Sequence, residues 1–410
     1  MSFAGIARAC AWFAFPVVGM LWIATRYGHN WYHFDEWALI ERTTTPNGWL
    51  SGAFTGFFGH LYVGSYVVYR IQRVWFGLEG HQFVFVAFCA SLGAMQITIA
   101  AVLRRLEPPT LVALLGATVV TFFGPGAQSM SWEFMMGANF ALALAFGAAF
   151  IAFREHRTPS AAVGIATLLI LSIAADSGVA AFGAVFVGII VVGLWPRRLV
   201  FLALAAPLVA HLGWSALGDN SAYVLVPLGK VVSFGWQLFA LSAGGLVGGG
   251  ETKGMIEAAL RGPGSHVSSS PTIPLSGQTV GILVLVLASG CVAFGFAKRR
   301  VPRVVAVNLV GGVVAAVFAA AVLARTRAYL VPSSLIPGSR FVQWVAVFLL
   351  VGFAPAIAAS VRPASARAGR YLCVATVAAL IAVFVVNLDQ VRPIRQFEEA
   401  WGAGVESSVR

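Results

Sequence analysis

Residues 298 to 324 read KRRVPRVVAVNLVGGVVAAVFAAAVLA, a cluster of basic residues followed by a long apolar run. About 20 apolar residues in sequence are enough to cross the hydrocarbon core of a bilayer as a helix. The same pattern recurs along the chain and predicts eleven transmembrane helices. They lie near residues 6 to 25, 81 to 103, 110 to 125, 137 to 153, 160 to 175, 178 to 195, 198 to 215, 279 to 297, 302 to 324, 341 to 361 and 370 to 388. We therefore expect an all-α protein, a polytopic bundle of about eleven to thirteen transmembrane helices.

The composition supports a membrane protein. Hydrophobic residues make up 59% of the chain and charged residues 10%, whereas soluble domains carry about 25% charged residues. The net charge is +12, but the basic residues form short clusters between apolar runs, so we expect no nucleic-acid partner. Arginine greatly outnumbers lysine, and alanine and glycine are abundant, a composition typical of a GC-rich genome. We therefore expect the inner membrane of a bacterium.

The basic clusters predict the topology. They are Arg104/Arg105, Arg154/Arg157, Arg197/Arg198, Lys298/Arg299/Arg300/Arg303 and Arg362/Arg367/Arg370. Because cytoplasmic loops are rich in lysine and arginine, we place all five clusters and the N-terminus in the cytoplasm, with an uncleaved first helix. Residues 223 to 249 do not fit this count as a single crossing, and we expect a re-entrant helix, a surface-lying helix or two short crossings there. We expect residues 1 to 390 to form one transmembrane domain that includes an outer loop at 26 to 80 with the active site, and residues 391 to 410 to form a short extracytoplasmic tail.

The first extracytoplasmic loop, residues 26 to 80, is the richest in candidate chemistry. Its segment WYHFDEW, residues 31 to 37, places Asp35 and Glu36 among aromatic rings at the membrane surface. Amphipathic stretches follow and predict helices that lie flat on the membrane, with His60 between two of them. A carboxylate acting as general base and a histidine that positions a substrate or a metal would then share one cleft. The alternatives are a solvated acidic pair and a structural, hydrogen-bonded histidine.

Two further acids, Glu133 and Asp176, lie in very short connections on the same predicted face. The adjacent apolar runs would bury them in part, and a carboxylate there is costly unless it is paired or functional. We therefore expect both to contribute to substrate binding. Capping of the helix that follows is the alternative, and Asp176 or Ser177 would serve it well.

Arginines also occur at the predicted outer ends of two late apolar runs, against the positive-inside trend. Arg325 and Arg327 follow one run, and Ser339-Arg340-Phe341 begins the next. The guanidinium group matches phosphate oxygens with bidentate geometry, so we expect an anion-binding site. The alternative is simple contact with the headgroups of ordinary phospholipids.

Taken in order, these motifs resemble bacterial multi-pass glycosyltransferases of the GT-C superfold. The resemblance covers residues 5 to 360. It is carried by Asp35-Glu36 after the first run, Gly59-His60 followed by Tyr69-Arg70, the segment FGPGA at 123 to 127 leading to Trp132, Ser177-Gly178, and Ser339-Arg340-Phe341. Two positions depart from the usual pattern, because Glu36 stands where aspartate is common and Phe341 where tyrosine is usual.

The resemblance implies an enzyme of polysaccharide biosynthesis that transfers a sugar from a polyprenyl-phosphate donor to a cell-envelope acceptor at the outer membrane face. It implies Asp35 as the general base, assisted by Glu36, and Arg340 as the residue that holds the donor phosphate. His60 would lie near the donor, and Arg325 or Arg327 would share the phosphate charge.

Some GT-C enzymes bind a divalent metal through the acidic pair. Nothing in this sequence requires one, and oxygen ligands would favour Mg or Mn. The alternative functions are a non-catalytic protein that binds lipid-linked sugars and a transporter or flippase of envelope precursors. Against transport, the sequence shows no pair of ionisable residues in mid-span and no repeated halves.

Overall fold

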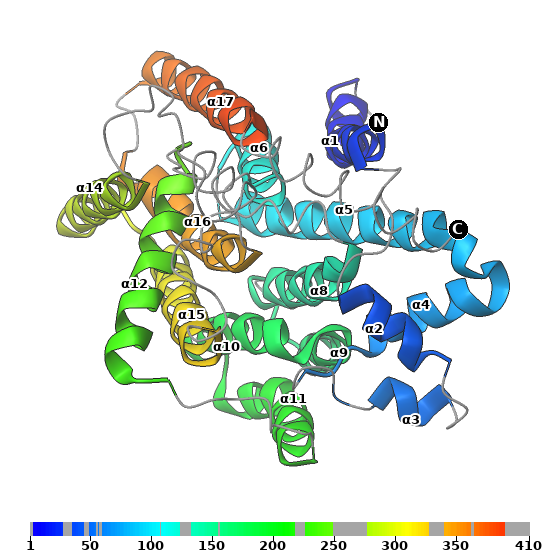
Figure 1. Ribbon diagram of the computed structural model, residues 1–410. Coiled ribbons are helices and arrows are strands. Elements are labelled where there is room, and N and C mark those ends of the chain that lie inside the picture. The colour runs from blue at the N-terminus through cyan, green and yellow to red at the C-terminus, as the bar shows by residue number, and fades with distance from the viewer. Residues whose placement is uncertain are drawn as a thin grey trace.

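The computed structural model describes residues 3–27, 35–44, 49–54, 56, 60–106, 108–123, 133–154, 156–217, 226–248, 277–327, 340–361 and 365–389, and these residues contain helices and no β-strand (Figure 1). The helices are α1 (Phe3–Tyr27), α2 (Asp35–Arg42), α3 (Trp49–Phe54), α4 (Val63–Phe76), η1 (Leu78–Gly80), α5 (His81–Arg105), α6 (Thr110–Thr121), η3 (Glu133–Met135), α8 (Met136–Ala152), α9 (Pro159–Ala175), α10 (Ser177–Leu194), α11 (Arg197–Leu217), α12 (Leu228–Gly245), α14 (Gly277–Ala297), α15 (Arg303–Arg327), α16 (Arg340–Ser360) and α17 (Ala366–Asp389).

Each of the eleven predicted apolar runs contains a helix. Eight helical segments in the described part of the chain are long and apolar enough to cross a membrane: Leu78–Arg105, Glu133–Ala152, Ser177–Leu194, Arg197–Ser215, Gly277–Ala297, Arg303–Arg327, Arg340–Ser360 and Ala366–Leu388. Two other predicted spans form shorter apolar helices, Thr110–Thr121 and Pro159–Ala175. The first predicted span lies in α1 (Phe3–Tyr27), whose apolar stretch among the residues with described side chains is Ala14–Thr25. Within its described residues the chain is therefore a polytopic helical bundle, in which each predicted run contains a helix and eight segments are long and apolar enough to span a membrane.

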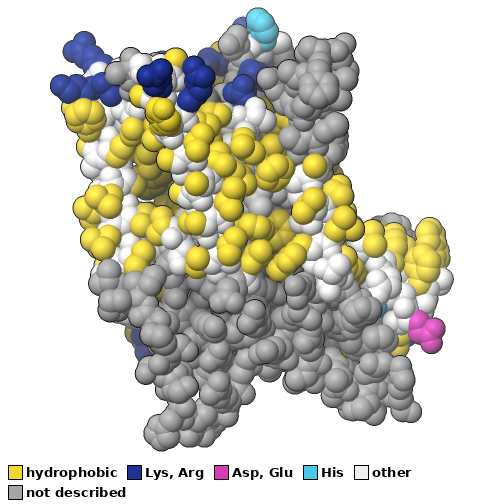
Figure 2. Space-filling view, turned by 90° about the horizontal axis from the view of Figure 1, so that it is seen from above, with side chains coloured by type: hydrophobic (Ala, Val, Ile, Leu, Met, Phe, Trp, Pro, Cys, Tyr) yellow, Lys and Arg dark blue, Asp and Glu magenta, His cyan; other side chains and the backbone are white. Residues whose placement is uncertain are grey.

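Side chains at one end of the bundle connect the predicted cytoplasmic loops to one another. Four hydrogen bonds make these connections: Arg105 Nε to Phe153 O (3.4 Å), Trp195 Nε1 to Ala152 O (2.8 Å), Arg303 Nη2 to Gly193 O (3.0 Å) and Arg300 Nη1 to Ser360 O (3.1 Å). They bring together the C-terminal ends of α5, α8, α10, α14 and α16, which we call the basic end. Figure 2 shows lysine and arginine side chains gathered at one end of a broad apolar band. The clusters thus share one end of the bundle, as the sequence predicted.

Small residues and buried amides fix how the helices pack. Gly312 of α15 lies against Gly352 of α16, so close that a Cβ at Gly312 would stand 2.6 Å from the Gly352 Cα. The buried Asn308 amide donates to the Val351 carbonyl at 2.7 Å between these same helices. Close approach at glycines and interhelical hydrogen bonds are the usual means by which helices associate within lipid. These contacts hold α15 and α16 side by side, which matters because the candidate site lies where α15 ends and α16 begins.

Helix α12 lies within residues 223 to 249, for which the sequence left three alternatives open. It packs beside α14, α15 and α16 (Figure 1). Gly235 approaches Ala320 and Ala324 near the C-terminal end of α15, and the Ser242 hydroxyl donates to Val342 O at 2.9 Å in the first turn of α16. Since all these contacts lie at the end of the bundle opposite the basic end, α12 crosses its neighbours at one level. The contacts therefore favour a helix that lies across the bundle.

The described part of the first predicted outer loop forms three short helices, of which α2 and α3 each pack against α4. Helix α4 buries Tyr66 and Tyr69 and leaves Trp75 and Phe76 exposed by 73% and 51%. This distribution is typical of an amphipathic helix at a membrane surface. The tail 391 to 410 lies outside the described residues.

Candidate functional site

A small cavity of about 50 Å³ lies at the end of the bundle opposite the basic end, which we call the site end. It is formed where α15 ends and where α10 and α16 begin, beneath the segment that precedes α4. Its lining residues are His60, Tyr62, Asp176, Gly178, Val179, Phe182, Val322, Leu323, Thr326, Arg327, Arg340, Phe341 and Trp344. A single water needs about 10–15 Å³, so the cavity has room for a few waters or one small anionic group and not for a sugar ring.

Arg327, the last residue of α15, contacts His60 across the cavity, with 3.2 Å between Arg327 Nη2 and His60 Nε2. A guanidinium group can only donate hydrogen bonds, so Nε2 must be the acceptor and the ring proton lies on Nδ1. The ring is neutral for a second reason. Burial of the ring, with the Arg327 and Arg340 charges, lowers the pKa of His60 to about 3. At physiological pH, His60 therefore adds no charge to the cavity and holds the Arg327 side chain in place.

His60 is itself fixed by the start of α10. The Ser177 backbone N–H donates to Leu61 O at 3.1 Å, and the Ser177 hydroxyl accepts from Leu61 N at 2.8 Å. The imidazole lies against Gly178, where a Cβ would collide with the ring nitrogen Nδ1. The Tyr62 ring meets it edge-on, with 5.8 Å between ring centroids. The glycine at 178 thus allows the histidine to reach Arg327.

Asp176 precedes α10 and caps it, accepting hydrogen bonds from Gly178 N at 2.9 Å and Val179 N at 3.2 Å through Oδ1. The residue is 1% exposed. Burial raises the pKa of Asp176 to about 6, although its two backbone donors, the Arg340 charge and the Tyr62 hydroxyl favour the charged form. Asp176 is therefore a helix cap, which was the alternative for this residue, and it also lines the cavity. Its contribution to substrate binding stays a prediction.

Arg340 completes the charged lining. It is the first residue of α16, and its guanidinium group lies over the Phe341 ring, 5.0 Å from the centroid. Among the described lining residues, two guanidinium groups thus face one carboxylate and one neutral histidine. A partly enclosed cavity with this excess of positive charge favours an anion, and phosphate oxygens suit the planar arginine fork.

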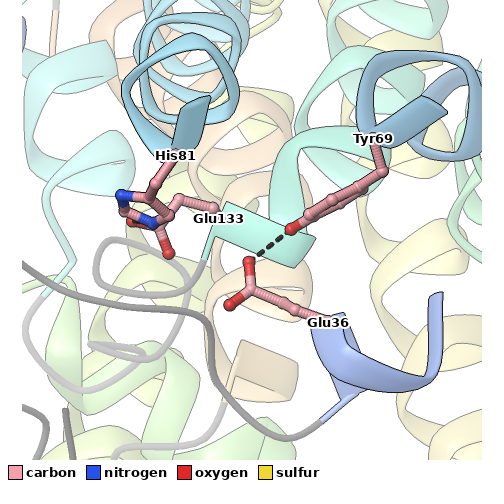
Figure 3. A network of polar contacts seen from close by, with 4 residues as sticks. All are labelled: Glu36, Tyr69, His81 and Glu133. Carbon is pink, nitrogen blue, oxygen red and sulfur yellow. Dashed lines mark hydrogen bonds and ion pairs between the residues drawn. The ribbon is translucent and has the colours of Figure 1, made fainter. Parts of the chain in front are cut away.

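A second polar cluster lies nearby (Figure 3). The Tyr69 hydroxyl donates to Glu36 Oε1, and His81 Nε2 lies 3.4 Å from Glu133 Oε1. Glu36 and Glu133 are both fully buried, and the Glu133 oxygens accept no hydrogen bond within the described part of the chain. An isolated buried carboxylate is strongly unfavourable, so His81 is the partner on which Glu133 depends.

The two clusters adjoin each other through aromatic contacts. The Tyr62 ring, at the edge of the cavity, packs on Phe134 with 5.0 Å between centroids, and Phe134 directly follows Glu133. Helix α2, which carries Glu36, contacts η3, which carries Glu133. Acids from three separate segments of the sequence therefore gather at the site end.

The structure brings together some of the predicted site residues and not others. His60, Asp176, Arg327 and Arg340 line the cavity, whereas Arg325 is exposed and does not. Glu36 and Glu133 lie in the second cluster. The Asp35 backbone begins α2, but its side chain and all of Ser339 lie outside the described residues, as do Trp132 and residues 124 to 127.

Sequence reasoning gave no role to Tyr62 or His81 and noted Tyr69 only as part of the resemblance. A signal was present for His81, which is a histidine at the start of an apolar run, immediately after Gly80. Its partner Glu133 begins another run on the same face. Comparing the polar residues at the predicted extracytoplasmic starts of the apolar runs would have suggested that His81 and Glu133 lie close together.

The acidic pair Asp35 and Glu36 is the place where the resemblance allows a divalent metal. Within the described residues, no group of three histidine, cysteine, aspartate or glutamate side chains is arranged to hold one. The Glu36 carboxylate already accepts a hydrogen bond from the Tyr69 hydroxyl. Mg or Mn therefore remains an expectation from the resemblance.

No protein family, curated protein sequence or solved structure matches this chain.

Proposed function

We propose that this chain is a membrane glycosyltransferase that transfers a sugar from a polyprenyl-phosphate donor to a cell-envelope acceptor at the site end of the bundle. The observation that carries the proposal is the convergence of Arg327 and Arg340 on a cavity the size of a phosphate group. By the positive-inside rule this end faces out of the cytoplasm, because the basic clusters lie at the other end.

The position of the two arginines suits a lipid-linked donor. Arg327 ends α15 and Arg340 begins α16, and both helices are of spanning length. Their guanidinium groups are therefore expected near the membrane–water interface. A polyprenyl phosphate requires this arrangement, since its tail stays in lipid while its phosphate seeks cations at the surface.

The reaction needs a base and a stabilised leaving group. The acceptor hydroxyl loses its proton as its oxygen bonds to the anomeric carbon, and the bond to the donor phosphate breaks with its electrons passing to phosphate. We assign the base to Asp35, with Asp176 as the second carboxylate to test because it lines the cavity. A positioned base contributes about 10²- to 10⁴-fold. Arg327 and Arg340 would stabilise the phosphate as its charge develops.

Glu36 fits a supporting role better than proton transfer. Its carboxylate is buried and bonded to Tyr69, an arrangement that holds α2 against α4. In this way Glu36 would set the position of the helix that begins at Asp35.

The test is turnover by the purified chain in lipid nanodiscs, supplied with a panel of polyprenyl-phosphate sugars and a cell-envelope extract as acceptor. Sugar transfer and released polyprenyl phosphate are measured by mass spectrometry. We expect Arg327→Gln and Arg340→Gln each to lower turnover by about 10²- to 10³-fold, the usual loss on removing one charge-stabilising donor. Arg73→Gln, a change on α4 outside the cavity, is the matched control and should keep wild-type turnover.

Variants of Asp35 and Asp176 identify the general base, and the transfer assay distinguishes an enzyme from a lipid-linked-sugar carrier. Asp35→Asn should lower turnover by about 10²-fold or more while leaving donor affinity unchanged. If instead Asp176→Asn abolishes turnover and Asp35→Asn does not, the base is Asp176. Binding of a polyprenyl-phosphate sugar without any transfer, for every donor in the panel, would refute the enzyme and favour a lipid-linked-sugar carrier.

A further inference from the structure

A second hollow lies at the basic end, far along the bundle from the site already described. It is an open groove of about 460 Å³ between α10 and α15. Its lining residues are Gly188, Ile189, Val192, Gly193, Arg303, Ala306, Val307 and Val310. With the exception of Arg303, every lining side chain is apolar or is the hydrogen of a glycine.

Glycine accounts for the shape of the groove. A Cβ at Gly188 would meet no atom within 4 Å, so this position opens directly into the hollow. Gly193, one and a half turns further along α10, lets Val307 of α15 come close. Val192 and Val310 are exposed by 65% and 53% and stand along the groove. The result is an apolar trough that runs between two membrane-spanning helices.

The groove ends at positive charge. The Arg303 guanidinium donates one hydrogen bond to Gly193 O at 3.0 Å, and its side chain is exposed. Arginine carries five N–H donors, so others remain for a ligand. Arg197 and Arg198 follow α10 directly, and neither α10, α11, α14 nor α15 contains an acidic residue.

We propose that this groove is a specific site for an anionic phospholipid, with one acyl chain in the trough and the headgroup phosphate on Arg303. A volume of 460 Å³ is in the usual range for small-molecule sites. Basic pockets between transmembrane helices at the cytoplasmic face are suited to anionic lipid headgroups. The groove lies between α10, which Asp176 caps, and α15, which ends at Arg327, so a bound lipid would brace both walls of the cavity. The proposal does not depend on the proposed function.

The probes are phosphatidylglycerol and phosphatidylcholine with identical acyl chains, titrated into the full chain in detergent and counted by native mass spectrometry. We expect one phosphatidylglycerol to bind at least tenfold more tightly than phosphatidylcholine. Arg303→Gln should remove this preference. Arg370→Gln, which removes an exposed arginine of the basic end outside the groove, should keep it. Equal affinity for the two lipids, or an unchanged preference in Arg303→Gln, would overturn the headgroup assignment.

Filling the trough tests the acyl chain separately. Gly188→Leu places a side chain in the open space without displacing any neighbour, and leucine favours a helix over glycine, so the variant should fold. We expect it to weaken phosphatidylglycerol binding at least tenfold. Gly290→Leu is the matched control, because a Cβ at Gly290 of α14 also meets no atom within 4 Å, and it should bind normally. Undiminished binding by a folded Gly188→Leu chain would refute the site.

Discussion

The carboxyl group of Asp176 should make the stability of the protein depend on pH. Its folded-state pKa of about 6 exceeds the ordinary value of 3.8, so the folded protein favours the protonated form. The contribution of Asp176 to stability is therefore fully present below about pH 3.8 and is lost as pH rises through about 6. Two pKa units correspond to roughly 3 kcal/mol.

Asp176→Asn isolates this effect, because asparagine caps helices about as well as aspartate and does not titrate. We expect the variant and the wild type to have similar thermal stability at pH 4, and the variant to be more stable at pH 7.5 by up to roughly 3 kcal/mol. Thermal unfolding in detergent at pH 4, 6 and 7.5 measures the difference, with the exposed Glu79→Gln as control. The contribution of His60 is common to both proteins and cancels. A difference that does not change with pH would contradict the prediction.

Gly178 is the residue on which the position of His60 depends. Gly178→Ala should push the imidazole away from Arg327, since the new methyl group would collide with His60 Nδ1. We expect a loss of about 1–3 kcal/mol in stability from overpacking, together with loss of donor turnover. Gly164→Ala on α9 is the control, because its Cβ would make an ordinary 3.6 Å contact with Ile151. Full turnover in Gly178→Ala would show that the His60–Arg327 contact is dispensable.

At the level of elements, the contact of α15 with α16 aligns the two arginines. Gly312→Leu would force these helices apart, because the obstacle to a Cβ is backbone: Gly352 Cα at 2.6 Å and Phe348 O at 2.7 Å. We expect a drop in unfolding free energy of about 1–3 kcal/mol or more and weaker donor binding, although position 312 is four turns from Arg327. Val314→Leu, at an exposed position on the same helix, should be neutral. Unchanged donor binding in a folded Gly312→Leu chain would show that the helix contact does not set the site.

Helix positions were largely predictable and helix register was not. Apolar runs of known length mark the spans, since hydrocarbon excludes most other sequences. Arg325 and Arg327 illustrate the limit. Both end the same run, but residues two apart on a helix point in nearly opposite directions, at about 100° per residue. Only the packing of α15 on α10 and α16 decides that Arg327 meets the cavity.

The orientation of α12 was hidden for a related reason. Its composition allows a crossing, a re-entrant path or a surface path, and the choice depends on which neighbours it meets. Gly235 and Ser242 contact two different helices at one level. Contacts of this kind join residues about 85 to 100 positions apart in the chain, and local sequence does not encode them.

In the molecule as a whole, the basic clusters and the buried acids lie at opposite ends of the bundle. Basic clusters gather at one end, tied together by hydrogen bonds to helix carbonyls, and the buried acids with two inward-facing arginines occupy the other. The sequence predicted this division because only 10% of its residues are charged. Charged side chains are costly within the hydrocarbon core, so most lie at the ends of the apolar runs. It did not predict that the acids form two adjoining clusters, since Tyr69 has no distinctive local pattern and His81 and Glu133 meet from two separate apolar runs.

The division leads to a test of orientation across the membrane. In a background with Cys10, Cys89, Cys291 and Cys373 replaced by alanine, single cysteines are introduced at Arg157 and Arg370 for the basic end, and at Thr44 and Glu79 for the site end. All four positions are exposed. In intact bacterial cells, a membrane-impermeant maleimide should label only positions 44 and 79, because cytoplasmic loops carry the positive charge. After permeabilisation all four should react, which shows that each thiol is accessible.

If the intact-cell pattern were reversed, Arg327 and Arg340 would face the cytoplasm, and the extracytoplasmic transfer reaction would have to be abandoned even with the cavity intact. If all four reacted in intact cells, the two ends would not be separated by the bilayer, and the bundle would not span it as described.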